Sequence, residues 1–158
     1  MTNRSRPWLV ALGVLGLLLS ACAVPAEPSR PAANGEFSRA MSVYRSPDCS
    51  CCHLWSEIAE QAGWTVATAD KLDLAAFKAE TGVPAEAASC HTAIIDGYFV
   101  EGHVPLAAIE QLLAERPLID GIALPGMPAG SPGMTGVADG PFEIVAISEG
   151  EVTLFGSY

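Results

Sequence analysis

Basic residues are scarce in this sequence. Lysine and arginine together number 8, against 18 aspartates and glutamates, so the 158-residue chain carries a formal charge of −10. Because contacts to phosphate groups depend on lysine and arginine, this balance excludes nucleic acid as a partner. An acidic chain is compatible with cations as ligands, although a solvated acidic surface explains the same excess.

Charged residues of both signs make up only 16% of the chain, whereas hydrophobic residues make up 50%. That composition excludes a disordered chain, and the length suits one domain.

Long hydrophobic runs are also lacking. The most apolar stretch, Trp8 to Leu19, holds ten hydrophobic residues in twelve. As a helix it would rise about 18 Å, which is too short to cross a hydrocarbon core of about 30 Å.

The first 21 residues are typical of a secretory signal, since Arg4 and Arg6 precede the apolar run. The segment at its end, Leu19-Ser20-Ala21-Cys22, resembles the bacterial lipobox. By that resemblance Cys22 is lipidated and becomes the first residue of the mature chain. An ordinary signal peptide that happens to contain a cysteine is the alternative.

Residues 22–40 are rich in alanine and proline and show neither a helical nor a strand period, which indicates a tether. Residue 23 is alanine rather than aspartate, which implies sorting to the outer membrane. We therefore expect a lipid-anchored protein of the cell envelope, on the periplasmic side. All 18 acids lie beyond residue 21, so loss of the signal with its two arginines changes the formal charge to −12.

Residues 41–158 form the predicted domain, whose elements follow the order β-α-β-α-β-β-α. Strands are expected at 41–45, 64–68, 92–95 and 98–100, and helices at about 51–62, 73–81 and 105–116. Asp96-Gly97, between the last two strands, is typical of a type I′ hairpin turn. This order is the thioredoxin-like arrangement, an α/β fold with a mixed sheet and flanking helices.

The C-terminal part of the domain has a different composition. Residues 124–134 hold six prolines and glycines in eleven positions, which predicts a loop rather than a regular element. Residues 142–147 and 152–155, separated by Glu149-Gly150, are expected to form a closing hairpin. The thioredoxin-like core is therefore followed by a Pro/Gly/Met loop and a hairpin.

Three cysteines, Cys49, Cys51 and Cys52, lie where the first strand gives way to the first helix. Free N–H groups and the helix dipole at such a position stabilise thiolate, the form that acts both as nucleophile and as metal ligand. Cys49 and Cys52 have the spacing of a redox Cys-x-x-Cys pair. The third cysteine favours a soft-metal cluster, because an oxidoreductase needs only two thiols.

Cys90 precedes the third strand, at the position of the loop that faces the Cys-x-x-Cys pair in thioredoxin-like proteins. The expected fold would therefore bring four thiols together from two distant parts of the sequence. The alternative is that the four cysteines form two structural disulfides in an oxidising compartment. The adjacent Cys51 and Cys52 argue against simple stapling, since both cannot easily share one loop partner.

Four further residues are candidate ligands because they gather around these cysteines or stand in the rigid loop: His91, His103, Met127 and Met134. Thioethers, thiolates and imidazoles form the ligand set that selects Cu(I). For the two methionines, a cap over an apolar patch is the alternative. His53 follows Cys52 directly, but an exposed helix residue is the simpler interpretation there.

Four motifs, in order along the chain, carry a resemblance to a known family: Cys49-Ser50-Cys51-Cys52, Ser89-Cys90-His91-Thr92-Ala93, Glu101-Gly102-His103-Val104-Pro105 and the segment 125–134. From about Val43 to Phe155 the sequence resembles the bacterial family of metal-binding domains of unknown function that includes the copper-resistance protein CopG. The resemblance implies a thioredoxin-like domain, secreted or displayed in the periplasm, that binds copper in a cysteine-lined cluster. It makes Cys49, Cys51, Cys52 and Cys90 the sulfur ligands, with His103, Met127 and Met134 as auxiliary ligands.

The leading hypothesis is a lipid-anchored copper-binding protein that supports copper resistance, with other envelope copper-handling proteins as partners. It would hold Cu(I) in a thiolate cluster, and its thiols would also allow interconversion of Cu(I) and Cu(II). The second hypothesis is a thiol–disulfide oxidoreductase that uses Cys49 and Cys52, although His91 stands where such enzymes carry a proline. The third is a disulfide-stapled interaction module without a metal.

Overall fold

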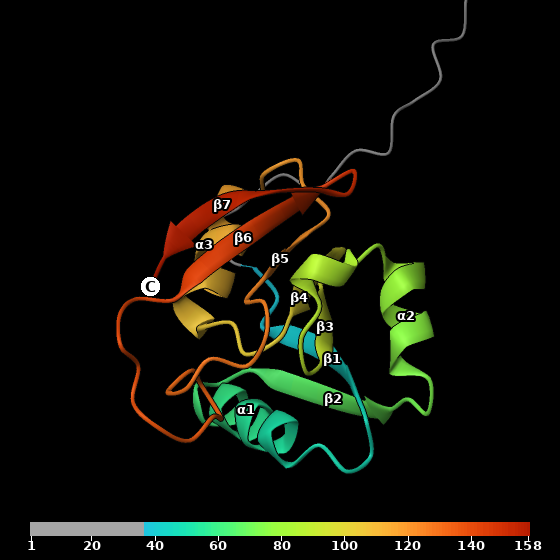
Figure 1. Cartoon of the computed structure of the whole chain (residues 1–158), viewed down its shortest axis with the longest axis vertical. Coiled ribbons are helices and arrows are strands. Elements are labelled where there is room, and N and C mark those ends of the chain that lie inside the picture. Colours follow the sequence, from blue (N-terminus) through green and yellow to red (C-terminus); the bar gives the residue numbers. More distant parts are fainter. Residues whose placement is uncertain (1–36) are drawn as a thin grey trace, which may run out of the picture. The chain divides into compact units, whose positions relative to one another are not determined.

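The computed structural model describes residues 37–158, so the predicted signal (1–21), the lipidation site Cys22 and most of the tether (22–40) lie outside the described residues. The described residues form a mixed α/β fold of one seven-stranded sheet and three α-helices (Figure 1). The strands are β1 (Ala40–Arg45), β2 (Thr65–Asp70), β3 (Thr92–Ile95), β4 (Tyr98–Glu101), β5 (Gly121–Ala123), β6 (Glu143–Ser148) and β7 (Glu151–Ser157). The α-helices are α1 (Ser50–Gln61), α2 (Leu74–Thr81) and α3 (Leu106–Glu115), and a 3-10 helix, η1, spans Ala85–Ala87. Among these described helices, none has the length and apolar character needed to cross a membrane.

The strands lie in the order β2-β1-β3-β4-β5-β6-β7. β1 and β2 run parallel on either side of the α1 crossover, and β3 runs antiparallel to both β1 and β4. β5 is parallel to β4, and β6 and β7 continue the sheet in antiparallel pairs. The first four strands therefore join a parallel βαβ unit to an antiparallel hairpin.

Short sequence signals set the ends of these elements. Asp96 and Gly97 have φ values of 48° and 86°, the positive values that a type I′ turn requires, and they join β3 to β4 as predicted. The Asp73 side chain caps α2 by accepting a hydrogen bond from the Ala76 N–H at 2.9 Å. Gly82, with φ 88°, ends the same helix in the left-handed conformation.

Apolar side chains form a separate core on each face of the sheet. On one face, Trp55 of α1 and Ile109 of α3 belong to the larger cluster. On the other, Val83 and Ala87, which follow α2, pack with Phe99 of β4. Because successive residues of a strand face opposite sides, the hairpin β3–β4 contributes to both clusters.

β5 is absent from the elements that the sequence predicts. It has only three residues, and all three are buried. Its pairing with β4 and β6 holds it in the sheet, and no periodic pattern shows over so short a segment.

The start of the described chain also contributes contacts. The Phe37 ring stacks on Trp64, and Arg39 forms an ion pair with Glu110 at 2.8 Å.

Candidate metal centre

The N-terminal end of α1 carries three of the candidate cysteines. A turn in which the Cys49 N–H donates to the Ser46 carbonyl at 3.2 Å leads from β1 into the helix, and Cys49 is its N-cap residue. Cys49 and Cys52, one helical turn apart, form a disulfide, while Cys51 is free. Cys52 is buried, and Cys49 and Cys51 are half-buried.

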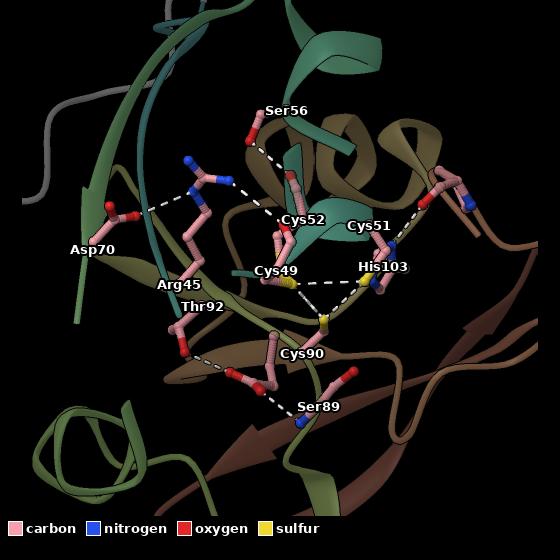
Figure 2. Close-up of a disulfide and its surroundings, with 12 residues drawn as sticks. Arg45, Cys49, Cys51, Cys52, Ser56, Asp70, Ser89, Cys90, Thr92 and His103 are labelled. Carbon is pink, nitrogen blue, oxygen red and sulfur yellow. Dashed lines mark hydrogen bonds and ion pairs between the residues drawn. A yellow bond between two sulfur atoms is a disulfide. The ribbon is translucent and has the colours of Figure 1, made fainter. Parts of the chain in front are cut away.

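Cys90 reaches this group from a different part of the chain, between η1 and β3. Its Sγ lies 3.0 Å from the Sγ of Cys49, 3.1 Å from that of Cys52 and 3.2 Å from that of Cys51. Figure 2 shows Cys90 pointing toward the cysteines of α1. The four sulfur atoms lie within 4.8 Å of one another, which confirms the predicted convergence; their role as metal ligands stays a prediction. The alternative of two disulfides is wrong, because Cys51 and Cys90 are both free.

The protonation of Cys90 follows from its surroundings. Burial, together with a hydrogen bond to the Cys51 thiol, raises the pKa of Cys90 to about 12. A neutral thiol is therefore its stable form while Cys49 and Cys52 are joined. A cation among the sulfur atoms would favour the thiolate instead, because metal binding competes with protons for cysteine sulfur.

Two buried histidines extend this group. Cys90, His91 and His103 each place one ligand atom within 4.8 Å of the others, and the two rings meet edge to face at 5.1 Å between centroids. Neither ring nitrogen of His91 has a hydrogen-bond partner among the described residues. Burial, and then the neighbouring His103, lowers the pKa of His91 to about 3, so its imidazole is neutral near pH 7 and offers a lone pair.

The tautomer of His103 is set by a backbone contact. Its Nδ1 lies 2.7 Å from the carbonyl oxygen of Pro132. Because a carbonyl only accepts, Nδ1 carries the proton and donates it, which leaves Nε2 as an acceptor. That Nε2 is buried and has no partner in the described part of the chain. Burial also lowers the pKa of His103. A metal-ligating histidine commonly has such a backbone partner on its other nitrogen.

The Pro/Gly/Met loop places its two methionines in different surroundings. At Gly133 the loop approaches α1 so closely that an added Cβ would lie 2.8 Å from the backbone nitrogen of Trp55 and 2.9 Å from the carbonyl oxygen of Cys51. Met134, the next residue, is half-buried. Met127 is 57% exposed. The loop therefore brings the neighbourhood of Met134 against the helix that bears three cysteines, while Met127 lies at the surface.

Near the cysteines lies a further buried residue, Glu101, which the sequence analysis does not name as a candidate site residue. Its carboxylate accepts hydrogen bonds from the Ser89 N–H and the Thr92 hydroxyl, both at 2.6 Å, and pairs with Lys78 of α2. The signal was present in the sequence, since an acid that ends an apolar hairpin strand needs polar partners when buried. Thr92 lies directly opposite Glu101 in that hairpin.

The site opens to solvent beside Cys49. An open depression of about 340 Å³ lies there, lined by Arg45, Pro47, Asp48, Cys49, Ser50 and His53. Arg45 lies between Asp70, at 3.5 Å, and the Cys49 carbonyl oxygen, to which it donates at 3.5 Å (Figure 2). Cys49 is the only one of the four cysteines among these lining residues, so a solute approaching from this side meets Cys49.

Comparisons with known proteins give consistent results. A family model described as a protein of unknown function, DUF411, matches residues 87–134, which include Cys90, both buried histidines and both loop methionines. Two solved structures of copper resistance protein CopG, forms 2 and 1, are each 41% identical to this chain with a TM-score of 0.70. The matches cover 75% and 78% of this chain and 97% and 98% of those chains, respectively. No curated protein sequence matches.

The fold and the site together define an α/β protein with a group of convergent cysteines and buried histidines suited to a soft metal ion. With 41% identity over nearly the whole length of the two solved structures, the chain belongs to the CopG-like copper-resistance family.

Proposed function

We propose that this protein binds copper in the cell envelope and supports copper resistance, with Cu(I) held by Cys49, Cys51, Cys52 and Cys90. The observation that carries the proposal is the grouping of these four sulfur atoms within 4.8 Å. Thiolates are soft ligands and therefore favour a soft ion such as Cu(I). The similarity to structures named copper resistance protein supports copper as that ion.

The described residues fit such an ion. The lone pairs on the His91 ring and on His103 Nε2 are buried without a partner in the described part of the chain, and buried polar atoms are rarely left so. We assign both histidines as auxiliary ligands beside the sulfur atoms. We also assign Met134 as an auxiliary ligand, because its loop packs against α1 at the adjacent Gly133. Met127, which lies at the surface, is assigned as an auxiliary ligand from the family resemblance alone.

Copper binding by all four cysteines requires the Cys49–Cys52 disulfide to be open, since thiolate is the ligand. An external dithiol reductant would open it: the disulfide takes up two electrons and two protons and gives two thiols, while the reductant is oxidised to its own disulfide. Bound copper would supply one-electron chemistry between Cu(I) and Cu(II). The chain's own residues would hold the ion, with Pro132 keeping His103 Nε2 free of a proton.

We also infer that the domain is thioredoxin-like. The order β2-β1-β3-β4, with its parallel βαβ unit and antiparallel hairpin, supports this assignment, as do the cysteines at the start of α1. A thiol–disulfide oxidoreductase is not favoured, although Cys49 and Cys52 do form a disulfide. His91 stands where thioredoxin-like oxidoreductases carry a proline, which argues against this activity.

The proposed location rests on the sequence alone. A lipid on Cys22 would anchor the chain at the periplasmic side of the outer membrane, and residues 22–40 would tether the domain to it. Other copper-handling proteins of the envelope are the partners that this location offers.

Anaerobic titration of the reduced full chain with Cu(I) tests the copper proposal. We expect several ions to bind per chain, with near-ultraviolet absorption from thiolate–copper bonds. The variant with serine at Cys49, Cys51, Cys52 and Cys90 is expected to lose both the ions and the absorption. Cys22→Ser is the matched control and keeps them, since Cys22 is not one of the four. Unchanged stoichiometry in the quadruple variant would overturn the proposal.

A further inference from the structure

A buried ion pair lies next to the copper site without belonging to its ligands. The side chains of Glu101 and Lys78 are 0% and 9% exposed. Taking two charges out of water is costly, and their mutual attraction does not reliably compensate for it. Stability alone is therefore a weak explanation for the pair, and its role is sought in the other hydrogen bonds that Glu101 and Lys78 make.

The contacts of Glu101 fall on both sides of two candidate ligands. One carboxylate oxygen, Oε1, accepts from the Ser89 N–H, and the other, Oε2, accepts from the Thr92 hydroxyl, each at 2.6 Å. Only Cys90 and His91 lie between Ser89 and Thr92. A single carboxylate thus holds both ends of the tetrapeptide that carries these two residues.

Lys78 holds the carboxylate from the other side. Its Nζ pairs with Glu101 Oε1 and also donates to the Thr92 hydroxyl oxygen at 3.1 Å. Lys78 comes from α2, whereas the other three cysteines come from the start of α1. The pair therefore connects the Cys90 segment to a helix that bears none of the other cysteines.

We propose that Glu101, held by Lys78, is a positioning residue for copper binding. It fixes residues 89–92 so that Cys90 Sγ meets the cysteines at the start of α1 and the His91 ring meets His103. This inference rests on the proposed copper function, since it names what places two of the ligands. Glu101 itself touches no ion.

Three variants separate positioning from folding. Glu101→Gln keeps the size of the side chain and removes its charge. Lys78→Met with Glu101→Leu replaces the pair by apolar side chains of similar volume, which buried ion pairs often tolerate. Thr92→Val removes only the hydroxyl between Lys78 and Glu101. Glu110→Gln is the matched control, because Glu110 pairs with Arg39 on the surface.

Two measurements on the full chain provide the readouts. Competition between the reduced protein and a chromophoric chelator for Cu(I) is expected to show affinity weakened by about 10- to 100-fold in Glu101→Gln and in the double variant, the usual loss when a ligand's supporting partner is removed. Glu110→Gln keeps the affinity of the original chain. Without copper, amide hydrogen exchange at Ser89 is expected to be at least about tenfold faster in the double variant, because the N–H has lost its acceptor. Amides of α3 report whether the fold is intact.

Full Cu(I) affinity in a folded double variant would overturn the inference and leave the proposed function standing. If the original chain does not bind Cu(I), the proposed function fails; the exchange rate then decides whether Glu101 holds the segment, and an unchanged rate at Ser89 would contradict that role. If the double variant does not fold, Thr92→Val decides the matter, and unchanged affinity and exchange in it would overturn the inference.

Discussion

Cys90 links the two groups of candidate ligands at the scale of single residues. It belongs both to the group of four cysteines and to the group that it forms with His91 and His103. It is free, and its Sγ touches both sulfur atoms of the Cys49–Cys52 disulfide. The state of that disulfide therefore decides whether the four cysteines offer two thiols or four.

The first prediction is that copper binding depends on reduction of this disulfide. In a Cys22→Ser background, thiol titration of the denatured protein is expected to find two thiols without a reductant, Cys51 and Cys90, and four after reduction. The oxidised form is expected to bind Cu(I) more weakly than the reduced form in anaerobic titration. Cys49→Ser with Cys52→Ser serves as the control, because it has two thiols under both conditions. Equal Cu(I) binding by the oxidised and reduced proteins would contradict the prediction.

The second prediction concerns His91 and pH. Its pKa is lowered to about 3 in the folded chain from a usual value near 6.5, so the unfolded chain binds more protons between these values. Stability without copper therefore falls as pH falls from about 6.5 toward about 3, with a slope approaching about 1.4 kcal/mol per pH unit from this one group.

Denaturant unfolding at pH 4, 5, 6 and 7 measures this slope. His91→Phe keeps an aromatic ring against Trp55 and is expected to make the slope shallower, with a contribution from His103 remaining. His53→Gln is the control, since His53 is exposed on α1 and the slope should persist. The same pH dependence in His91→Phe as in the original chain would show that His91 is not its source.

At the scale of elements, the loop after β5 is held by hydrogen bonds of its own although it forms no strand or helix. The Met134 N–H donates to the Ser131 carbonyl at 2.8 Å, and Ser131 is 1% exposed. In Figure 1 this segment, coloured orange, runs from β5 toward α1. Because Gly133 has no side chain, the loop can lie directly on the backbone of α1 at this residue.

The third prediction separates the effect of the contact between Gly133 and α1 from the effect of backbone strain at a glycine with positive φ. Gly133 and Gly126 have φ values of 83° and 71°, so alanine is strained at both, by roughly 1 kcal/mol. Only at Gly133 would the added Cβ meet the α1 backbone; at Gly126 it meets nothing within 4 Å. Gly133→Ala is therefore expected to cost about 1–3 kcal/mol more than Gly126→Ala in denaturant unfolding and to weaken Cu(I) binding. Equal losses in the two variants would mean that the contact is unimportant.

Most elements could be predicted because their signals are local, whereas the errors arise from contacts between distant segments. Asp96-Gly97 fixes the hairpin by its own backbone preference, and this needs no knowledge of the rest of the chain. In α1, by contrast, the apolar residues Leu54, Trp55, Ile58 and Ala59 recur at helical spacing, yet Leu54 and Ile58 are 46% and 37% exposed. Only Trp55 and Ala59 of that pattern reach the core, because they face the sheet.

At the scale of the whole molecule, the candidate site could be predicted as far as the fold determines it. Placing Cys90 opposite α1 required only the order of the elements, and the structure confirms the convergence. The Lys78–Glu101 pair could not be found this way, because a lysine in a predicted helix normally faces solvent. Its burial depends on how α2 lies against β3 and β4, which is a property of the assembled sheet.

The last prediction concerns the lipid anchor at Cys22, in the segment that precedes the described domain. If Cys22 carries a lipid, the full chain expressed in a Gram-negative bacterium is expected in the outer-membrane fraction on a density gradient, and Cys22→Ser in the soluble periplasmic fraction. Ala23→Asp tests the sorting signal separately, since it keeps the anchor and is expected to move the protein to the inner membrane. All three proteins should bind the same amount of Cu(I), because the four cysteines lie within residues 37–158. Recovery of Cys22→Ser in the outer-membrane fraction would contradict the anchor, whereas altered copper binding in it would mean that Cys22 takes part in the site.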